Sequence, residues 1–290
     1  MLIIADIHGR TFWKKKLEEC GALVEGKLTE EVVFMGDYLD HYQYEPDPIT
    51  KNYITSQSEF DNFKDILEFK RDNFDKVTLL LGNHDMEYIS DYCVPCRMNQ
   101  KHKKEISDLF KENIDLFKIG VYKKIGDKMV TFTHANICPS WVEIINPRLE
   151  EIGYKDFKPT KENGKDTCAD LIVVFNSLLE QSLSNPSLLD SIGSMLGHIG
   201  YGRGGNCPCG SMVWSDLSDY THDDYMWDDV YQVVAHTQHL VENNRFVYDE
   251  HMFCTDCHID ELGNRPIFRL LDEWKPLSPN RPINTCLEII

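Results

Sequence analysis

Near its first residue the sequence reads Leu2-Ile3-Ile4-Ala5-Asp6-Ile7-His8-Gly9, an apolar run that ends in an acid, an imidazole and a glycine. The apolar part predicts a buried β-strand, and the polar part predicts a loop at the carboxyl end of that strand. Because α/β proteins bind ligands at the carboxyl ends of their strands, Asp6 and His8 are candidates to hold one ion together. Asp-x-His is a common pattern, however, and decides little by itself.

Two more segments repeat this pattern. An apolar run at 32–35 is followed by Gly36-Asp37-Tyr38-Leu39-Asp40-His41, and a run at 77–81 is followed by Gly82-Asn83-His84-Asp85. Turn residues after a strand would explain one such case. Three runs that each lead into carboxylate, amide or imidazole side chains favour one polar site at a shared edge of a sheet.

The composition limits the classes of protein that need to be considered. The 290 residues are 42% hydrophobic, which is enough for the core of one α/β domain spanning 1–290. The formal net charge of −18 disfavours stable nucleic-acid binding, so a phosphate substrate would need local positive charge, which two divalent cations could supply. No apolar stretch is long enough to cross a bilayer and no leader pattern is found, so we expect a cytoplasmic protein without a membrane partner.

The ten cysteines, in a chain without a leader pattern, predict reduced thiols rather than a disulfide framework. Two close pairs, Cys93 with Cys96 and Cys207 with Cys209, could together offer four thiolates to a zinc ion. Unligated loop thiols are the preferred interpretation of these pairs. The segment Cys254-Thr255-Asp256-Cys257 has similar spacing inside a strand-like run, where the two thiols would not converge.

Apolar spacing predicts helices and strands along the rest of the chain. We expect helices at 11–20, 56–71, 101–117, 141–152, 168–183 and 188–196. We expect a hairpin at 121–125 and 129–133, a strand at 231–235, and antiparallel closing strands at 245–248, 252–256 and 267–271. Residues 140–205 would form a helical insertion and a glycine-rich loop within the domain.

Three later polar residues are candidates for the same site. His134 and His236 each follow a strand-like run directly. Arg203 lies in the glycine-rich segment 197–205, which lacks the Gly-Lys-Ser/Thr ending of a nucleotide-binding loop. This segment is either a flexible loop or a loop that brings Arg203 to a substrate phosphate.

The chain contains, in this order, Asp-x-His, Gly-Asp-x-x-Asp, Gly-Asn-His-Asp and the two later histidines. This series resembles the motifs of the calcineurin-like metallophosphoesterases. The resemblance extends over roughly residues 1–271 and implies a four-layer α/β/β/α sandwich. Trp214-Ser215-Asp216 narrows it to the branch that contains the serine/threonine phosphoprotein phosphatases. That branch has an arginine at the position of His41 in this chain. It has a second arginine after Trp-Ser-Asp, whereas this chain has no arginine from 217 to 244. His41 and Arg203 are the substitutes available to bind the substrate phosphate.

The resemblance also implies a centre with two divalent metal ions, for which Mn²⁺ is the first expectation and an Fe/Zn pair the alternative. The metal ligands would be Asp6, His8, Asp37, Asn83, His134 and His236, with Asp37 as the bridge and Gln238 or His239 as an additional ligand. His84 would be the general acid that protonates the leaving oxygen. Asp40 would orient His84 and raise its pKa.

The function implied is hydrolysis of a phosphomonoester, in a phosphorylated protein or a small molecule, by direct attack of a metal-bridging hydroxide. A nucleotide phosphoesterase, such as a dinucleoside polyphosphate hydrolase, shares the core motifs and is the alternative enzyme. The alternative outside the enzymes is a scaffold protein that binds the metal ions but has little turnover. The complete set of ligands disfavours a scaffold, because a decayed site would be expected to lack one or more of them.

Overall fold

The three strands that precede the first three motifs lie side by side in the larger of two main β-sheets of the computed structural model. The structure describes residues 1–94, 96–154, 156–222, 227–240, 246–258, 265–278 and 281–290. The strands of the larger sheet are β1 (Leu2–Ile4), β4 (Val32–Phe34), β5 (Val77–Leu80), β6 (Phe117–Lys118), β13 (Phe268–Ser278) and β14 (Arg281–Ile289). They are arranged in the order β14-β13-β1-β4-β5-β6. The four strands from β1 to β6 are parallel, whereas β13 is antiparallel to both of its neighbours.

The second sheet contains β7 (Gly120–Ile125), β8 (Lys128–Thr133), β9 (Val230–Val234) and β11 (Met252–Cys254), in the order β11-β9-β8-β7. β7 and β8 form the predicted hairpin, and β9 is parallel to both β8 and β11. The expected antiparallel strand at 252–256 is therefore parallel to its neighbour β9 in the sheet, although Phe253 forms an antiparallel bridge with Val247. The strand expected at 245–248 is reduced to an isolated bridge between Val247 and Phe253, and Arg245 lies outside the described residues.

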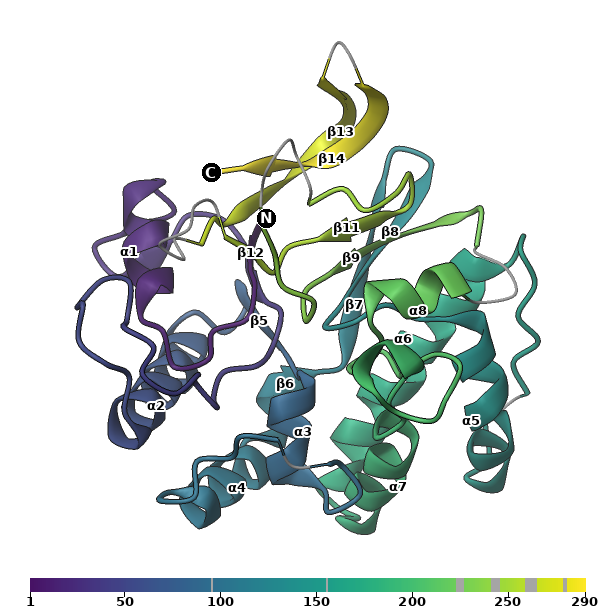
Figure 1. Cartoon of the computed structure of the whole chain (residues 1–290), viewed down its shortest axis with the longest axis horizontal. Helices are drawn as coiled ribbons and strands as arrows, with labels where there is room; N and C mark the ends of the chain where they lie inside the picture. Colours follow the sequence, from purple (N-terminus) through teal and green to yellow (C-terminus); the bar gives the residue numbers. More distant parts are fainter. Residues whose placement is uncertain (95, 155, 223–226, 241–245, 259–264, 279–280) are drawn as a thin grey trace.

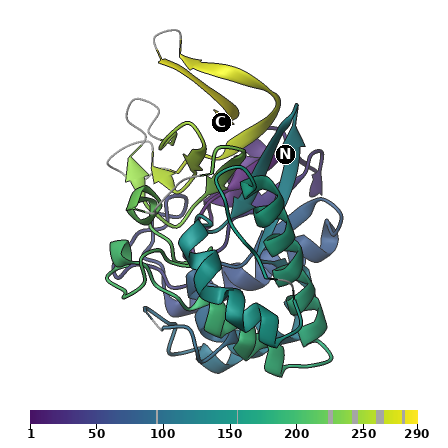
Figure 2. The same cartoon turned by 90° about the vertical axis from the view of Figure 1, so that its right-hand side faces the viewer.

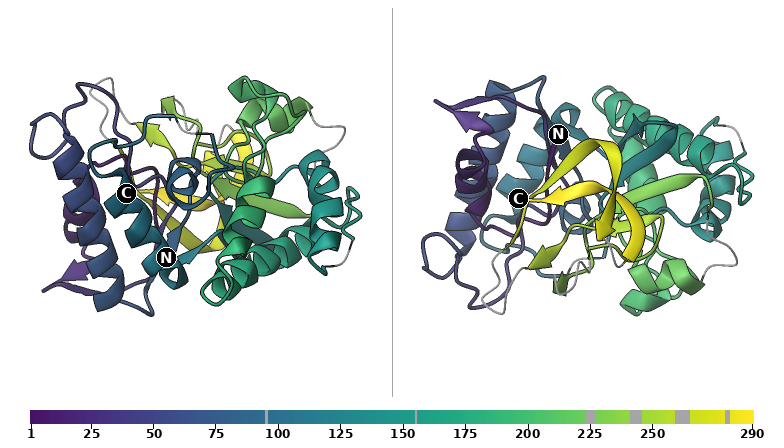
Figure 3. Two further views of the ribbon diagram at one scale, coloured as in Figure 1. Left: turned by 90° about the horizontal axis from the view of Figure 1, so that it is seen from below. Right: turned by 90° about the horizontal axis from the view of Figure 1, so that it is seen from above.

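Alternate residues of β1 face opposite layers of the molecule. Ile3 shares a buried apolar cluster with Phe132 and Val233 of the second sheet, so the two sheets pack face to face. Leu2 and Ile4 belong to the other cluster, which lies against the helices. Seen along the sheets, the molecule consists of helices, sheet, sheet and helices in that order (Figure 3). This arrangement confirms the predicted α/β/β/α sandwich.

The helices cover the two outer faces of the sheets (Figure 1). Those of the first half are α1 (Phe12–Glu19), α2 (Ser56–Asp72), α3 (Asn83–Ile89) and α4 (Lys103–Glu112). Those of the second half are α5 (Pro139–Glu151), α6 (Gly164–Ser182), α7 (Ser187–Leu196) and α8 (Leu217–His222). Asn176 attaches α6 to the second sheet, since its amide oxygen accepts from the Ile119 backbone (2.8 Å) and its nitrogen donates to the Gly120 carbonyl (2.9 Å).

Several boundaries differ from those expected. The helix expected at 101–117 ends at Glu112, because the 3₁₀ turn Ile114–Leu116 and strand β6 follow it. α3 was not predicted, and neither was a second 3₁₀ turn at Tyr201–Arg203. The expected strand at 267–271 is only the start of β13, which pairs with the unpredicted β14 in a hairpin that projects from the body (Figures 1 and 2).

Two short strand pairs lie outside the main sheets. β2 (Leu23–Val24) pairs with β3 (Lys27–Leu28), and β10 (His239–Leu240) pairs with β12 (Cys257–His258). Because Cys254 ends β11 and Cys257 begins β12, the interpretation of 254–257 as one strand is wrong.

The cysteines also differ from the expectation of reduced thiols throughout. One disulfide joins Cys138, at the start of α5, to Cys209. Of the other three cysteines considered as zinc ligands, Cys93 is buried with its thiol directed at the Gly193 carbonyl, Cys207 is partly exposed and Cys96 is exposed.

No helix in the described part of the chain combines the length and the apolar character needed to cross a membrane.

Candidate active site

Five strands end at one place in the molecule and deliver polar side chains to it. These side chains directly follow the carboxyl ends of β1, β4, β5, β8 and β9, and they are Asp6, His8, Asp37, Asn83, His134 and His236. Each is at most 9% exposed. All but His134 line a cavity of about 140 Å³, and His134 contacts two of them, Asp37 and Asn83. The structure therefore brings together all six residues that the sequence placed in one site.

The loops that hold these side chains have a strained backbone. His8, Asp37 and His236 adopt left-handed φ angles of 42°, 53° and 63°, which are uncommon for residues other than glycine. Gly36 has a φ of 103°, and a Cβ at this position would lie only 2.5 Å from the Gly82 nitrogen. A Cβ on Gly82 would lie 2.2 Å from Asp37 Oδ1. The glycines of the two motifs therefore allow two site loops to touch each other.

Asp85 connects the same two loops. It is fully buried, and its carboxylate accepts from the backbone nitrogens of Asp37 (2.7 Å), Tyr38 (3.0 Å) and Gly82 (2.8 Å). The last residue of the Gly-Asn-His-Asp motif thus fixes the position of the Asp37 loop rather than facing the cavity.

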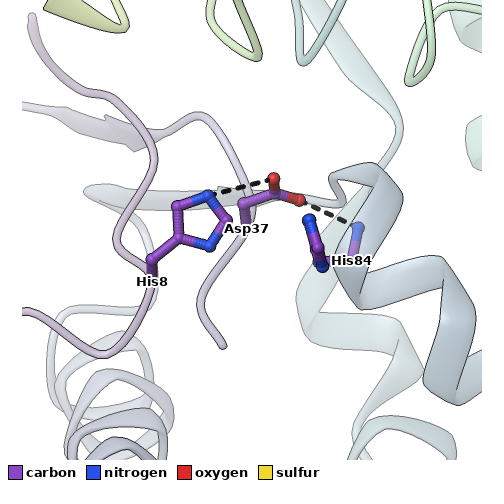
Figure 4. Close-up of side chains that lie close together, drawn as sticks. All are labelled: His8, Asp37 and His84. Carbon is purple, nitrogen blue, oxygen red and sulfur yellow. Dashed lines mark hydrogen bonds and ion pairs between the residues drawn. The ribbon is translucent and has the colours of Figure 1, made fainter. Parts of the chain in front are cut away.

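Asp37 lies at the centre of the site. Its Oδ2 is 3.6 Å from His8 Nε2 and 3.4 Å from His134 Nε2, and its Oδ1 accepts from the His84 backbone at 3.0 Å. Figure 4 shows Asp37 between His8 and His84. One carboxylate oxygen that faces two imidazole nitrogens has the position expected of a ligand shared between two cations.

The imidazoles of His8 and His134 both direct Nε2 toward other residues of the site. His8 Nδ1 donates to the Leu39 carbonyl (2.8 Å) and His134 Nδ1 donates to the Met35 carbonyl (2.8 Å), so Nε2 is the nitrogen of each ring that is left to bind a cation. His134 Nε2 is also 3.1 Å from Asn83 Oδ1. Burial lowers the pKa of His134, but the carboxylates of Asp37 and Asp6 outweigh it and raise this pKa to about 10.

His236 supplies an unsatisfied nitrogen. Its Nε2 is buried and has no hydrogen-bond partner among the described residues. Burial, reinforced by Arg203, holds the pKa of His236 well below its usual value, so the ring is neutral and able to ligate. Two groups have ligand atoms within 4.8 Å of one another here: His8, Asp37 and His84, and Asp37, His134 and His236. Imidazole nitrogens and carboxylate oxygens in this arrangement fit divalent transition-metal ions.

His84 and Asp40 form a pair beside these groups. His84 Nδ1 donates to Asp40 Oδ2 at 2.9 Å, and the other oxygen of Asp40 accepts from the Tyr88 hydroxyl and the Asn99 backbone. Burial lowers the pKa of His84, but Asp37 and the hydrogen bond to Asp40 outweigh it, so this pKa is raised above its usual value. The pair therefore favours a protonated imidazole at neutral pH.

Arg97 is one of two functional candidates in the cavity that the sequence did not predict. Its Nη2 is 3.4 Å from His84 Nε2, its Nε donates to the Asp40 carbonyl (3.2 Å), and its guanidinium carbon lies 3.8 Å from the Tyr42 ring centroid. The sequence gives no signal for this role beyond a single positive charge after Cys96. Stacking and the hydrogen bond fix a cation at the cavity.

Asp256 is the second residue that was missed, and here a signal existed. It lines the cavity just past β11 and pairs with the buried side chain of Arg265. Because β11 is parallel to β9, Asp256 follows the carboxyl end of a strand, as Asp6 and His236 do. Because the sequence analysis expected this segment to be antiparallel, it did not place Asp256 at the same end of the sheet as His236.

The other candidate residues occupy different environments. Arg203 lines the cavity, with Nε 2.9 Å from Asp216 Oδ2 and Nη2 donating to the His236 carbonyl (3.0 Å). Gln238 also lines the cavity. His41 does not lie among the cavity-lining residues of the described chain and instead contacts Glu59 Oε2 at 2.6 Å. The side chain of His239 lies outside the described part of the structure.

The comparison with protein-family models agrees with this site. Residues 1–217 match the family model described as calcineurin-like phosphoesterase, so all of the site residues except those after β9 and β11 fall within the match. No curated protein matches the sequence. Two solved structures of a cold-active protein tyrosine phosphatase, one of them a mutant, show 12–14% identity and TM-scores of 0.48 and 0.43. The alignments cover 92% of this chain and 72–73% of those chains. The chain belongs to the calcineurin-like phosphoesterase family, whose members are metal-dependent phosphoester hydrolases.

Proposed function

We propose that this chain hydrolyses phosphomonoesters at a centre of two divalent cations. The observation that carries the proposal is the position of Asp37 Oδ2, which faces His8 Nε2 at 3.6 Å and His134 Nε2 at 3.4 Å. Asp6 and His8 would hold one cation, Asn83, His134 and His236 the other, and Asp37 both. Gln238, at the exposed side of the cavity, is a candidate additional ligand. When bound, such a pair of cations supplies an activated water and neutralises charge on the phosphoryl group.

His84 is proposed as the general acid. Its Nδ1 is held by Asp40 Oδ2 at 2.9 Å, so Nε2 of the protonated ring faces the cavity. Donation of the Nε2 proton to the leaving oxygen is most valuable for an alkoxide, which leaves poorly without a proton. Asp40 acts through His84 as a positioning residue, because its second oxygen is held by Tyr88 and Asn99.

Two arginines are proposed to bind the phosphoryl oxygens. Arg97 is held by Tyr42 and the Asp40 carbonyl, whereas Arg203 is held by Asp216 of Trp214-Ser215-Asp216. The ion pair of Arg203 with Asp216 places a cation next to the Trp-Ser-Asp motif, which resembles a motif of the serine/threonine phosphatase branch. A cavity of about 140 Å³ suits a phosphoryl group, while the ester group would extend into solvent past Tyr42. This favours phosphorylated proteins or small phosphomonoesters as substrates.

A substrate panel tests the proposal. We expect Mn²⁺-loaded protein to hydrolyse phosphoserine peptides and para-nitrophenyl phosphate, and chelation of the metal to remove this activity. Faster turnover of dinucleoside polyphosphates or cyclic nucleotides would instead favour a nucleotide phosphoesterase. Protein that is fully metal-loaded, by elemental analysis, but turns over none of these esters would contradict the enzyme proposal and favour a metal-bound scaffold.

A further inference from the structure

A third group of possible ligands lies next to the site and contains the cysteine Cys96. Together with His84 and Glu87 it offers ligand atoms that all lie within 4.8 Å of one another. His84 and Glu87 are one turn apart on α3, and Cys96 follows that helix and lines the cavity. The group is the only one of the three in the described part of the chain that includes sulfur.

Glu87 gives an independent indication that this group binds a cation. The residue is only 6% exposed, and its Oε2 accepts from the Cys96 backbone at 2.9 Å, which fixes the carboxylate. Its Oε1 is buried, lies 3.8 Å from His84 Nδ1, and has no hydrogen-bond donor among the described residues. A buried carboxylate oxygen without a partner is unfavourable, and a cation between Glu87 and His84 would satisfy it.

The chemistry of the ligand atoms distinguishes this group from the proposed centre around Asp37. Thiolate, imidazole and carboxylate together favour Zn²⁺, whereas Mn²⁺ prefers oxygen-rich sites. Three protein ligands leave the fourth tetrahedral position open to water. A zinc ion here would displace the thiol proton of Cys96 to solvent.

We infer that His84, Glu87 and Cys96 form a third metal site that prefers zinc, and that zinc bound there inhibits the enzyme. His84 Nδ1 lies between Asp40 Oδ2 (2.9 Å) and Glu87 Oε1 (3.8 Å). This atom cannot donate a proton to Asp40 and a lone pair to zinc at the same time. Filling the third site therefore separates His84 from Asp40. Binding does not depend on the proposed function, whereas inhibition rests on the proposed role of His84.

Cobalt provides a probe of binding that is independent of activity. Mn²⁺-loaded protein titrated with Co²⁺ should develop a thiolate-to-cobalt charge-transfer band in the near ultraviolet, because the third site is the only candidate metal site among the described residues that offers sulfur. We expect the band in the wild type and in Cys207→Ser, which removes a partly exposed thiol elsewhere. It should be absent from Cys96→Ser and weakened in Glu87→Gln. A band that persists in Cys96→Ser, or a wild type without one, would overturn the site.

Inhibition is measured separately, with each variant compared with its own zinc-free rate. Stoichiometric Zn²⁺ added to the Mn²⁺-loaded protein should lower phosphomonoester hydrolysis about tenfold or more in the wild type and in Cys207→Ser, but not in Cys96→Ser. Equal inhibition of the wild type and Cys96→Ser would place the effect at the Asp37 centre and refute the inhibitory role. If no phosphoester is hydrolysed at all, the proposed function fails, while the cobalt band still decides whether the third site exists.

Discussion

The two walls of the active-site cavity are built in different ways. The strand-end wall consists of Asp6, His8, Asp37, Asn83 and His236, with His134 in contact with Asp37 and Asn83. The loop wall consists of Tyr42, Arg97 and Arg203, whereas Cys96 and Gln238, which are proposed as metal ligands, line the cavity beside it. Side chains of the strand-end wall are buried and follow β-strands directly. On the loop wall, Tyr42 is 42% exposed and the Arg203 side chain is 30% exposed.

This difference separates residues that hold cations from residues that meet substrate. Parallel strands fix the positions of their carboxyl ends relative to one another, and the touching loops of Gly36 and Gly82 leave little room for adjustment. Loop residues are held by contacts of their own side chains with other loops, such as those of Arg97 with the Tyr42 ring and the Asp40 carbonyl. We therefore expect substitutions in the strand-end wall to change metal content and those in the loop wall to change substrate affinity.

The largest effect is expected for Asp37→Asn in the strand-end wall. The amide keeps the shape of the side chain but removes the negative charge shared by two cations. Loss of several kcal/mol of charge stabilisation corresponds to roughly a 10³-fold or greater fall in kcat. Elemental analysis should show that metal occupancy falls toward one ion per chain.

The matched control for this substitution is Asp61→Asn, which changes an exposed aspartate of α2 in the same way. It should keep both metal content and kcat. Full metal occupancy with full turnover in Asp37→Asn would remove Asp37 from the centre and would break the distinction between the two walls.

The next largest effect is expected for His84→Asn. General-acid catalysis contributes about 10²- to 10⁴-fold, so this variant should lose that much activity toward a serine phosphate. Para-nitrophenyl phosphate has a good leaving group and should show a much smaller loss. Equal losses on both substrates, or loss of a metal ion, would assign His84 to metal or phosphate binding.

Asp40→Asn sharpens the same prediction through pH dependence. The raised pKa of His84 keeps the acid protonated at neutral pH, so removing the Asp40 carboxylate should lower that pKa. The alkaline limb of the kcat profile for a serine phosphate should then move to lower pH. If Asp40 acts only through His84, the double variant with His84→Asn should be scarcely slower than His84→Asn alone. Additive losses would contradict a positioning role.

A smaller effect is expected for Arg97→Gln in the loop wall. Loss of a charge-assisted hydrogen bond of about 1.5–3 kcal/mol to the phosphoryl group predicts roughly a 10- to 100-fold fall in kcat/KM, mainly through KM. Metal content should not change. Arg203→Gln is the comparison, and its effect should be smaller because Asp216 already neutralises part of that charge at 2.9 Å. A loss of metal in Arg97→Gln would contradict the proposed division of roles.

The strand-end wall was predictable from the sequence because its signal is local. A short apolar run followed by glycine and a metal-binding side chain specifies both a strand and the place where it ends, as at Phe34 and Asp37. The sandwich was implied by the family resemblance of these motifs, and in the structure the successive residues Ile3 and Ile4 face different layers. The direction of β11 was not predictable in this way, because strand direction depends on contacts distant in the sequence.

The loop wall was largely not predictable. Arg97 reaches the cavity because Tyr42 and the Asp40 carbonyl hold it there, and neither contact leaves a pattern near Arg97 in the sequence. Arg203 was expected from its charge in a glycine-rich segment, but not its pairing with Asp216. His41 was expected to contact phosphate because it takes the place of an arginine in a motif, yet its partner Glu59 comes from α2.

The smallest effect is expected for His41→Gln, which tests whether a loop residue adjacent to the motifs belongs to either wall. The hydrogen bond with Glu59 raises the pKa of His41 above its usual value. A raised pKa in the folded state means that the stabilisation is complete below the usual pKa of histidine and is lost as the pH rises through the folded-state pKa. His41→Gln should therefore lower the free energy of unfolding on the acid side of that range by about 1 kcal/mol or less, since the imidazole is partly exposed. Above that range the two proteins should be equally stable.

Denaturant unfolding at several pH values measures this difference in stability between His41→Gln and the wild type, and the KM for a phosphomonoester should stay within about twofold of the wild type. A tenfold rise in KM without a pH-dependent change in stability would place His41 at the phosphate, as the motif position alone suggested, and would extend the loop wall to include it.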